Sequence, residues 1–242
     1  MLRCCRTSCS RLARAPAIVE RGGVRIGFLQ RTSIYWATHH EAREGAPGVA
    51  VIQGNTAWQL PMHNWRPDAP PLNRPGLPPQ VVTWVEPRYL QSFQEDIEKL
   101  RREVDVVVAS CHWGVWEEVL QYMRDIAHGA IDAGADIVLG HGPHYALPVE
   151  LYKGKPVFYG LGCFAFHTGH GGDEFGDWVG MIVRARLEGK RVAATSFQFV
   201  RHNAENETFL CPLAGEREVM ERVERDSRGA RLTPAGDAVL VD

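Results

Sequence analysis

Residues 104–114 read VDVVVASCHWG, and residues 136–144 read DIVLGHGPH. Each segment begins with a short, nearly continuous apolar run, which is typical of a strand buried on both faces of a parallel sheet. Residues 116–133 lie between the two runs and repeat apolar side chains at helical spacing, with Gly134 at a position typical of a helix C-terminus. The order strand, helix, strand predicts a right-handed βαβ crossover.

Further helices and strands are predicted on both sides of this crossover. Apolar residues at three- and four-residue spacing after Pro87 predict a helix over residues 87–100. The other predicted elements are strands at 23–29 and 156–162, an antiparallel hairpin of 178–186 and 191–200, and a charged helix at 216–226. The predicted fold class is therefore α/β.

A proline-rich segment separates the first predicted strand from the first predicted helix. Residues 61–87 hold eight of the fifteen prolines of the chain. Proline cannot continue a regular helix and does not donate to the ladder of a central strand. Because the segment is also rich in aromatic residues, it predicts a long loop packed over the surface.

Composition limits the classes of protein that this chain can belong to. It has 242 residues, 45% of them hydrophobic and 23% charged, which excludes a wholly disordered or fibrous chain. Its net charge of −2 offers no basic excess for nucleic acid, and no apolar run approaches the roughly 20 residues of a membrane helix. The six cysteines form no disulfide framework, so we expect mostly reduced thiols, and the expected location is cytoplasmic or left open.

The first residues of the chain differ in composition from the rest. Residues 1–19 carry four arginines and no acidic residue. This composition is loosely that of an organelle transit peptide, and it lacks the apolar core of a secretory signal. A frayed terminal tail explains it equally well.

Histidines follow the carboxyl ends of the two buried strands. Ligands bind at that edge of an open α/β sheet, and the crossover brings His112, His141 and His144 to the same edge. Three imidazoles suit a divalent ion such as Zn, Mn or Fe. A histidine after a strand can also be a satisfied core or capping residue, and that alternative stays open.

A glycine-rich loop with two more histidines follows the third strand. Residues 167–173 read HTGHGGD and include His170. Such a loop can place an imidazole toward a substrate or bind an anion with its backbone amides. It can equally be a surface loop without a ligand.

Three segments together resemble the CapA family of capsule-synthesis and poly-γ-glutamate-associated proteins: residues 110–114, 130–144 and 149–162. The resemblance implies a calcineurin-like metallophosphoesterase fold, with a β-sandwich flanked by helices and a metal centre at the strand ends. It implies that His112, His141 and His144 are metal ligands, or that one of the last two contacts substrate. His144 and His170 are the candidate catalytic residues.

The chain also departs from the family pattern. The family's Gly-Asp strand and Asn-Asn-His element are absent, and Cys163 stands where the family commonly has Asn. We therefore expect residues 1–11 to be a disordered or foreign tail and residues 12–242 to be the C-terminal portion of the domain. The three histidines then hold one ion more readily than two.

Three functions follow from these residues. The first is a metal-dependent phosphoesterase-like hydrolase of a phosphoester or anionic polymer in capsule, poly-γ-glutamate or other cell-envelope metabolism, with weak or no activity if the chain is truncated. The second is a non-catalytic remnant or accessory binding protein that associates, with itself or a partner, through exposed sheet edges. The third is a cysteine hydrolase that uses Cys111 or Cys163 with a nearby histidine.

Overall fold

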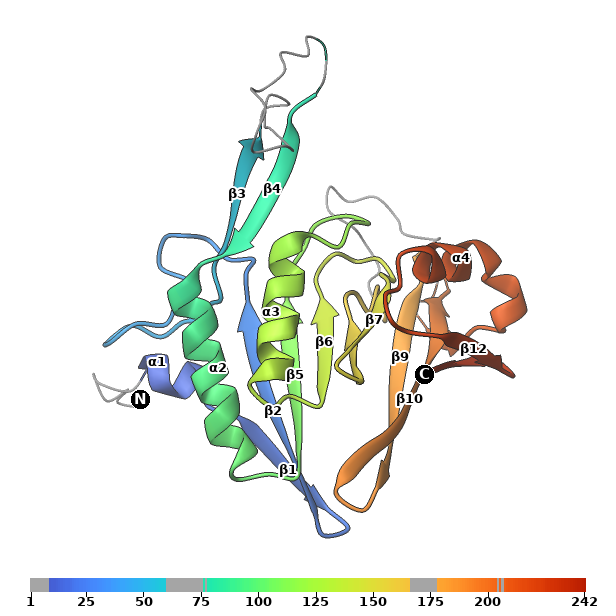
Figure 1. The fold of residues 1–242 in the computed structure, drawn as a ribbon, viewed down its shortest axis with the longest axis horizontal. Helices are drawn as coiled ribbons and strands as arrows, with labels where there is room; N and C mark the ends of the chain where they lie inside the picture. Colours follow the sequence, from blue (N-terminus) through green and yellow to red (C-terminus); the bar gives the residue numbers. More distant parts are fainter. Residues whose placement is uncertain (1–8, 60–75, 77, 166–177, 204, 206) are drawn as a thin grey trace, which may run out of the picture.

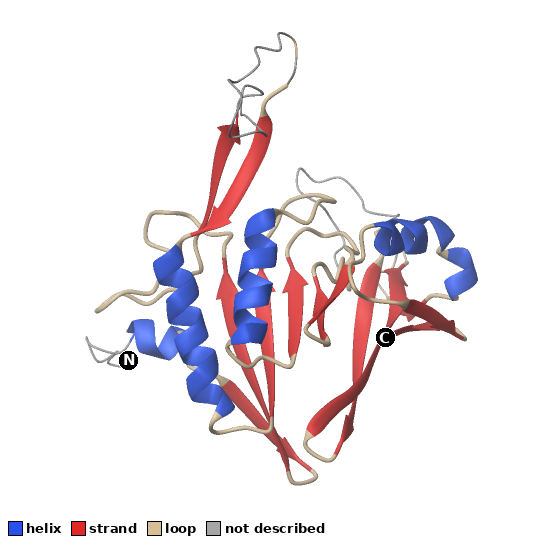
Figure 2. Cartoon of the chain, viewed as in Figure 1, coloured by secondary structure: helices blue, strands red, loops and turns tan. Residues whose placement is uncertain are grey.

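The computed structural model describes residues 9–59, 76, 78–165, 178–203, 205 and 207–242. Two β-sheets pack face to face, and helices cover the outer face of the larger sheet (Figures 1 and 2). The helices are α1 (Cys9–Ala13), α2 (Pro87–Arg101), α3 (Gln121–Asp132) and α4 (Arg217–Arg225), with a short 3-10 helix at Leu213–Gly215. This arrangement confirms the predicted α/β class with sheets flanked by helices.

The larger sheet has six strands in the order β1-β2-β5-β6-β8-β7. The strands β2, β5, β6 and β8 run parallel, and the edge strands β1 and β7 run antiparallel to their neighbours. Their bounds are β1 Ala17–Arg21, β2 Val24–Thr32, β5 Val106–His112, β6 Ile137–His141, β7 Val149–Tyr152 and β8 Lys155–Phe158. The succession β5, α3, β6 confirms the predicted crossover.

Strand β5 is buried on both faces, as its continuous apolar run predicts. Side chains alternate across a strand, so Val107, Ala109 and Cys111 face the helices, whereas Val106 and Val108 face the second sheet. The helical side of this core is completed by apolar residues spaced three or four apart: Phe93, Ile97 and Leu100 of α2, and Met123, Ile126 and Ala130 of α3.

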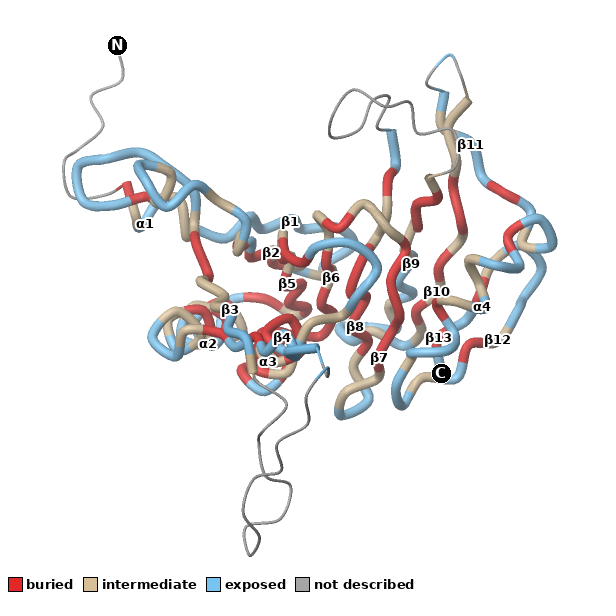
Figure 3. The backbone as a smooth tube through the Cα atoms, turned by 90° about the horizontal axis from the view of Figure 1, so that it is seen from above, coloured by how far each residue is buried: buried red, intermediate tan, exposed pale blue. Residues whose placement is uncertain are grey.

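The second sheet is built around the long strand β10 (Arg191–His202). It pairs with β9 (Gly180–Glu188), β11 (Thr208–Leu210) and β13 (Ala238–Val241), and β12 (Leu232–Ala235) extends the sheet beyond β13. Buried side chains of both sheets meet in one core, with Phe158 against the edge of Phe197 at a centroid distance of 6.4 Å. Figure 3 shows this buried backbone where the two sheets face each other. The predicted hairpin and the charged helix α4 are confirmed.

The proline-rich segment does not form only a loop. Gln80–Val85 is strand β4, which pairs antiparallel with β3 (Gly54–Gln59) in a two-stranded ribbon that projects from the body (Figure 1). A two-stranded ribbon leaves one edge of each strand unpaired, so prolines next to β4 do not prevent pairing. The loop prediction for residues 61–87 was therefore wrong for 80–85, and residues 60–75 and 77 lie outside the described residues.

Several strands escaped prediction. Strand β7 is joined to β8 by Lys153 and Gly154, which both have positive φ, at 51° and 73°. This is the geometry of the tightest hairpin turns, and Lys-Gly is a weaker signal for it than Asn-Gly. The strands β1, β12 and β13 were also missed, and the predicted strand at 156–162 ends at Phe158.

The N-terminal region is described only from Cys9, which is buried in α1. Residues 1–8 lie outside the described residues, so the predicted division between a tail at 1–11 and a domain at 12–242 stays a prediction. Among the described residues, no helix combines the length and the apolar character needed to cross a membrane.

Candidate functional site

A row of polar side chains crosses three neighbouring parallel strands at their carboxyl ends. The strand register places Thr32 of β2 opposite His112 of β5, and His112 opposite His141 of β6. Alternation along each strand puts all three on the face that looks toward the second sheet. The row therefore lies where an open α/β sheet presents its ligand sites.

His112 is held by a hydroxyl group. Its Nδ1 lies 2.9 Å from Oγ1 of Thr32, which fixes the ring and leaves Nε2 as the second ring nitrogen. Burial lowers the pKa of His112, because desolvation disfavours the imidazolium. At neutral pH the ring is therefore uncharged, which is the form that binds metal ions.

His141 is held in a similar way by the same sheet. Its Nε2 lies 3.1 Å from Oγ of Ser110, and its carbonyl oxygen accepts a 2.8 Å hydrogen bond from the amide of Trp113. Burial and the neighbouring His112 both lower the pKa of His141. The centroids of the two imidazole rings are 5.5 Å apart, so the structure brings these two predicted ligands together.

The glycine after His141 makes room for the ring of His112. Gly142 has φ +115°, and a Cβ at this position would lie 2.8 Å from Cδ2 of His112 and 2.8 Å from the carbonyl oxygen of Trp113. Any larger residue would therefore displace the His112 ring or the strand end. The glycine of the Gly-His-Gly-Pro-His segment is thus part of how the histidine pair is packed.

A cavity of about 310 Å³ opens next to the pair. Its wall combines the polar row with the neighbouring loop and the end of α1: Ala13, Gln30, Arg31, Thr32, Gly48, Val49, Ala50, His112 and His141. The site thus has space for a small ligand against two neutral imidazoles and a hydroxyl group.

His144 lies along a different cavity. Its Nδ1 is 3.2 Å from Sγ of Cys163, and its ring packs against Trp178 at a centroid distance of 5.1 Å. A cavity of about 480 Å³ is lined by His144 and Trp178 and also borders Arg201 and Arg222. The structure therefore does not place His144 in the cavity of the His112–His141 pair, and the predicted catalytic residue His170 lies outside the described residues.

The histidine pair fits part of a metal site. A catalytic zinc ion takes three protein ligands, whereas the pair supplies two neutral imidazoles. Within the part of the chain that the structure describes, no group of three or more His, Cys, Asp or Glu side chains is placed to hold a metal ion. The pair can therefore supply two positions of a coordination sphere, and the assignment of His112, His141 and His144 as metal ligands stays a prediction.

The cysteines of the third hypothesis are buried. Cys111 points into the helix-side core, and burial raises its pKa to about 12. Cys163 lies beside His144, but burial raises its pKa to about 12 as well. A nucleophilic cysteine needs a lowered pKa, so these environments argue against a cysteine hydrolase.

Sequence reasoning missed two residues of the site. Thr32 and Ser110 hold the two imidazoles, yet the first strand was predicted to end before Thr32. No signal in the sequence pointed to Thr32, because Gln30, Arg31 and Thr32 are three consecutive polar residues without the alternation of a strand. The role of Thr32 becomes visible only with the register between β2 and β5.

A family model described as "Bacterial capsule synthesis protein PGA_cap" matches residues 9–168. The chain is 38% identical over 87 residues to the PGA biosynthesis protein CapA of Bacillus subtilis (strain 168), a match that covers 35% of this chain and 23% of that protein. It is 40% identical over 82 residues to the capsule biosynthesis protein CapA of Bacillus anthracis, which covers 33% and 20%.

Two further proteins are similar to this chain. A probable polyglutamine synthesis accessory protein of Mycobacterium tuberculosis is 42% identical over 64 residues, or 26% of this chain and 17% of that protein. The crystal structure of a hypothetical protein from Thermus thermophilus gives a TM-score of 0.41 with 16% identity, over 81% of this chain and 62% of that one. The sequence matches thus span less than a quarter of the length of these curated relatives.

Proposed function

Because this chain belongs to the bacterial capsule synthesis protein family PGA_cap, we propose that it is a metal-dependent phosphoesterase-like hydrolase acting on an anionic cell-envelope polymer. Membership confirms the resemblance expected from residues 110–162. The names of the Bacillus relatives connect those proteins with PGA and capsule biosynthesis. The polymer proposed for this chain is therefore poly-γ-glutamate or a capsule component of similar charge.

The observation that carries the proposal is the pairing of His112 with His141. Two uncharged imidazoles lie across adjacent strand ends, beside a cavity that a small group can enter. A divalent ion bound there would polarise a phosphoryl oxygen and lower the pKa of a bound water. The ion would be Mn, Fe or Zn, because imidazole ligands suit these ions.

The chain's own residues would orient the pair and the substrate. Thr32 and Ser110 each hold one ring nitrogen, which leaves Nε2 of His112 and Nδ1 of His141 as the nitrogens for a ligand. Hydrogen bonds of this kind fix the tautomer and the angle of a metal-binding imidazole. We retain His144 and His170 as candidate residues for contacting substrate.

Metal content and phosphodiesterase turnover test the proposal together. The purified chain is loaded with Mn, its bound metal is measured, and hydrolysis of bis(p-nitrophenyl) phosphate is followed. The proposal expects bound metal and turnover in the wild type and the loss of both in His141→Ala. A wild type that is folded, free of metal and inactive after loading would refute it.

A second candidate function is a non-catalytic accessory binding protein. It is favoured by the incomplete donor set among the described residues, and one relative is itself named a probable accessory protein. Such a protein would bind the polymer without metal, and the edge strand β1, exposed at all five residues, offers a site for self-association. Polymer binding in EDTA, with sedimentation of the bound and free forms, separates this function from the first.

A further inference from the structure

A third cavity, of about 730 Å³, lies between α1 and α2. Its wall includes the cations Arg11, Arg14 and Lys99 and the carboxylates Asp96 and Glu103. It neighbours the cavity beside the His112–His141 pair, because Ala13 lines that cavity and the next residue, Arg14, lines this one. Arg31 also connects them, since it lines the cavity beside the His112–His141 pair and binds Asp96, which lines the third cavity.

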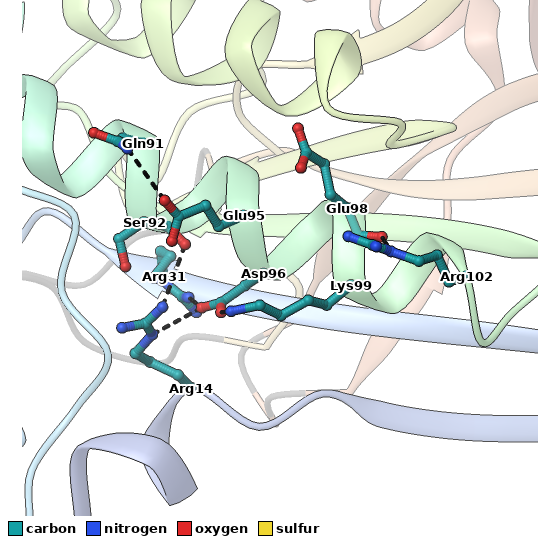
Figure 4. Close-up of polar contacts among 9 residues, drawn as sticks. All are labelled: Arg14, Arg31, Gln91, Ser92, Glu95, Asp96, Glu98, Lys99 and Arg102. Atoms are coloured by element: carbon teal, nitrogen blue, oxygen red, sulfur yellow. Dashed lines mark hydrogen bonds and ion pairs between the residues drawn. The ribbon is translucent and has the colours of Figure 1, made fainter.

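Three cationic side chains converge on one carboxylate in this wall. Nε of Arg14 lies 2.7 Å from Oδ2 of Asp96, the guanidinium of Arg31 binds the same oxygen, and Nζ of Lys99 lies 3.8 Å from Oδ1 (Figure 4). The adjacent carboxylate of Glu95 accepts a hydrogen bond from Gln91 instead. Asp96 therefore balances only one of the three cations.

The charge of the whole cavity is positive. Arg11 adds a fourth cation and Glu103 adds a second carboxylate, so two positive charges remain unbalanced among the residues of the wall and the buried Arg31. This excess is local, because the chain as a whole carries a net charge of −2. A cluster of one sign lining a concave surface concentrates counter-ions of the opposite sign.

The buried arginine fixes the position of the shared carboxylate. Arg31 donates to the carbonyl oxygen of Gln30 at 2.8 Å and stacks over Phe93 at 5.0 Å, with 2% of its side chain exposed. Asp96 therefore forms its ion pair with a cation that is buried away from solvent. Lys99, with 64% of its side chain exposed, and the exposed Arg11 are the cations left to meet a ligand.

We infer that this basic cavity binds the anionic groups, carboxylate or phosphate, of a polyanion whose chain runs past the histidine pair. Both chemistries pair with arginine and lysine side chains through charge-assisted hydrogen bonds. The identity of the polymer rests on the proposed function, whereas the binding of anions rests only on the cavity and its charge. A polymer with a charge on every unit would meet the histidine pair and the basic cavity at once.

Fluorescence anisotropy with two labelled probes tests the inference in EDTA. The probes are an oligo-γ-glutamate, which carries carboxylates, and a short polyphosphate. In the double variant Arg11→Gln with Lys99→Gln, binding should weaken about tenfold, since exposed charge pairs each contribute little. The matched control is Arg102→Gln, because Arg102 lies on the same helix region as Lys99, bonds to the Glu98 carbonyl oxygen and does not line the cavity.

The outcomes distinguish carboxylate from phosphate as the bound group. They also distinguish the basic cavity from the proposed hydrolase function. A selective loss with either probe supports the inference and identifies the chemistry that the cavity takes. Unchanged binding in the double variant, or an equal loss in Arg102→Gln, overturns it. Because the assay contains EDTA, its result is independent of metal content and turnover, which decide the proposed function separately.

Discussion

His112 and His141 lie opposite each other on adjacent parallel strands, and their ring centroids are 5.5 Å apart. Neighbouring strands lie about 4.8 Å apart, so this spacing is set by the sheet itself. A slip of one residue in the pairing of β5 with β6 would send one ring to the opposite face. The pair is therefore a product of strand register and not of a flexible loop.

We first predict that both imidazoles are needed for metal affinity. His112→Ala and His141→Ala should each weaken Mn or Zn binding by about a hundredfold, since loss of even an indirect partner costs about 10- to 100-fold. Isothermal titration calorimetry on the metal-free chain measures this loss. His128→Gln is the control, because His128 pairs with Glu150 and stacks on Tyr152 away from the pair. Equal affinities in the three variants would contradict the prediction.

The second prediction concerns Ser110, which we expect to act by positioning His141. Its hydroxyl lies 3.1 Å from Nε2 of His141, so Ser110→Ala removes that contact without adding volume. Metal affinity should fall about tenfold, as for other indirect partners of a metal ligand. Thermal stability should change little, and Ser110→Thr should restore affinity in part. A large fall in thermal stability with unchanged metal affinity would show that the hydroxyl is purely structural.

Local sequence pattern predicted the centre of the fold. The β-branched run that became β5 and the apolar spacing that became α3 each specify their own structure without distant contacts. The crossover rule then places His112 and His141 at one edge of the sheet. This part of the site follows from residues that are close together in the sequence.

The rest of the site depends on contacts that sequence pattern does not encode. Thr32 reaches His112 only through the pairing of β2 with β5, across 80 positions of sequence. His144 has a positive φ of 66°, and its ring lies beside Cys163 instead of beside His112 and His141. Single-sequence reasoning places residues near a strand end but does not give the direction of a turn that follows the strand.

The third prediction is that Gly140 is required by the packing of Trp113. A Cβ on Gly140 would lie 2.4 Å from Nε1 of Trp113 and 2.4 Å from the carbonyl oxygen of Tyr159, two atoms joined by a 2.8 Å hydrogen bond. Gly140→Ala should therefore lower the free energy of unfolding by about 1–3 kcal/mol, as overpacking does.

Urea denaturation provides the measurement, with Gly215→Ala as the control. A Cβ on Gly215 would meet no atom within 4 Å, so its substitution should change stability by less than about 0.5 kcal/mol. Two variants of equal stability would show that the Trp113 environment relaxes around the added methyl group.

The fourth prediction is that Asp96 stabilises the fold by compensating Arg31. Burial lowers the pKa of Arg31, since desolvation disfavours its charged form, yet an arginine stays protonated at neutral pH. Asp96→Asn leaves this buried cation without its carboxylate and should cost roughly 3 kcal/mol of unfolding free energy. Glu95→Gln, one residue away and bonded only to Gln91 among the described residues, should cost less than about 0.5 kcal/mol. Equal losses of unfolding free energy in Asp96→Asn and Glu95→Gln, measured by chemical denaturation, would contradict the prediction.

The fifth prediction is a loss of stability at alkaline pH that depends on Cys111. Burial raises the pKa of Cys111 from 9.0 to about 12, so between these values the unfolded chain loses a proton that the folded chain keeps. The unfolded state then binds fewer protons, and the free energy of unfolding falls as pH rises, by at most about 1.4 kcal/mol per pH unit.

Denaturation at about pH 8 and about pH 10 measures this fall. Cys111→Ala should show a smaller fall than the wild type, because Cys163 and Tyr89, whose pKa values burial also raises to about 12, contribute equally to both proteins. Identical falls would mean that Cys111 ionises as readily in the folded chain as in the unfolded one.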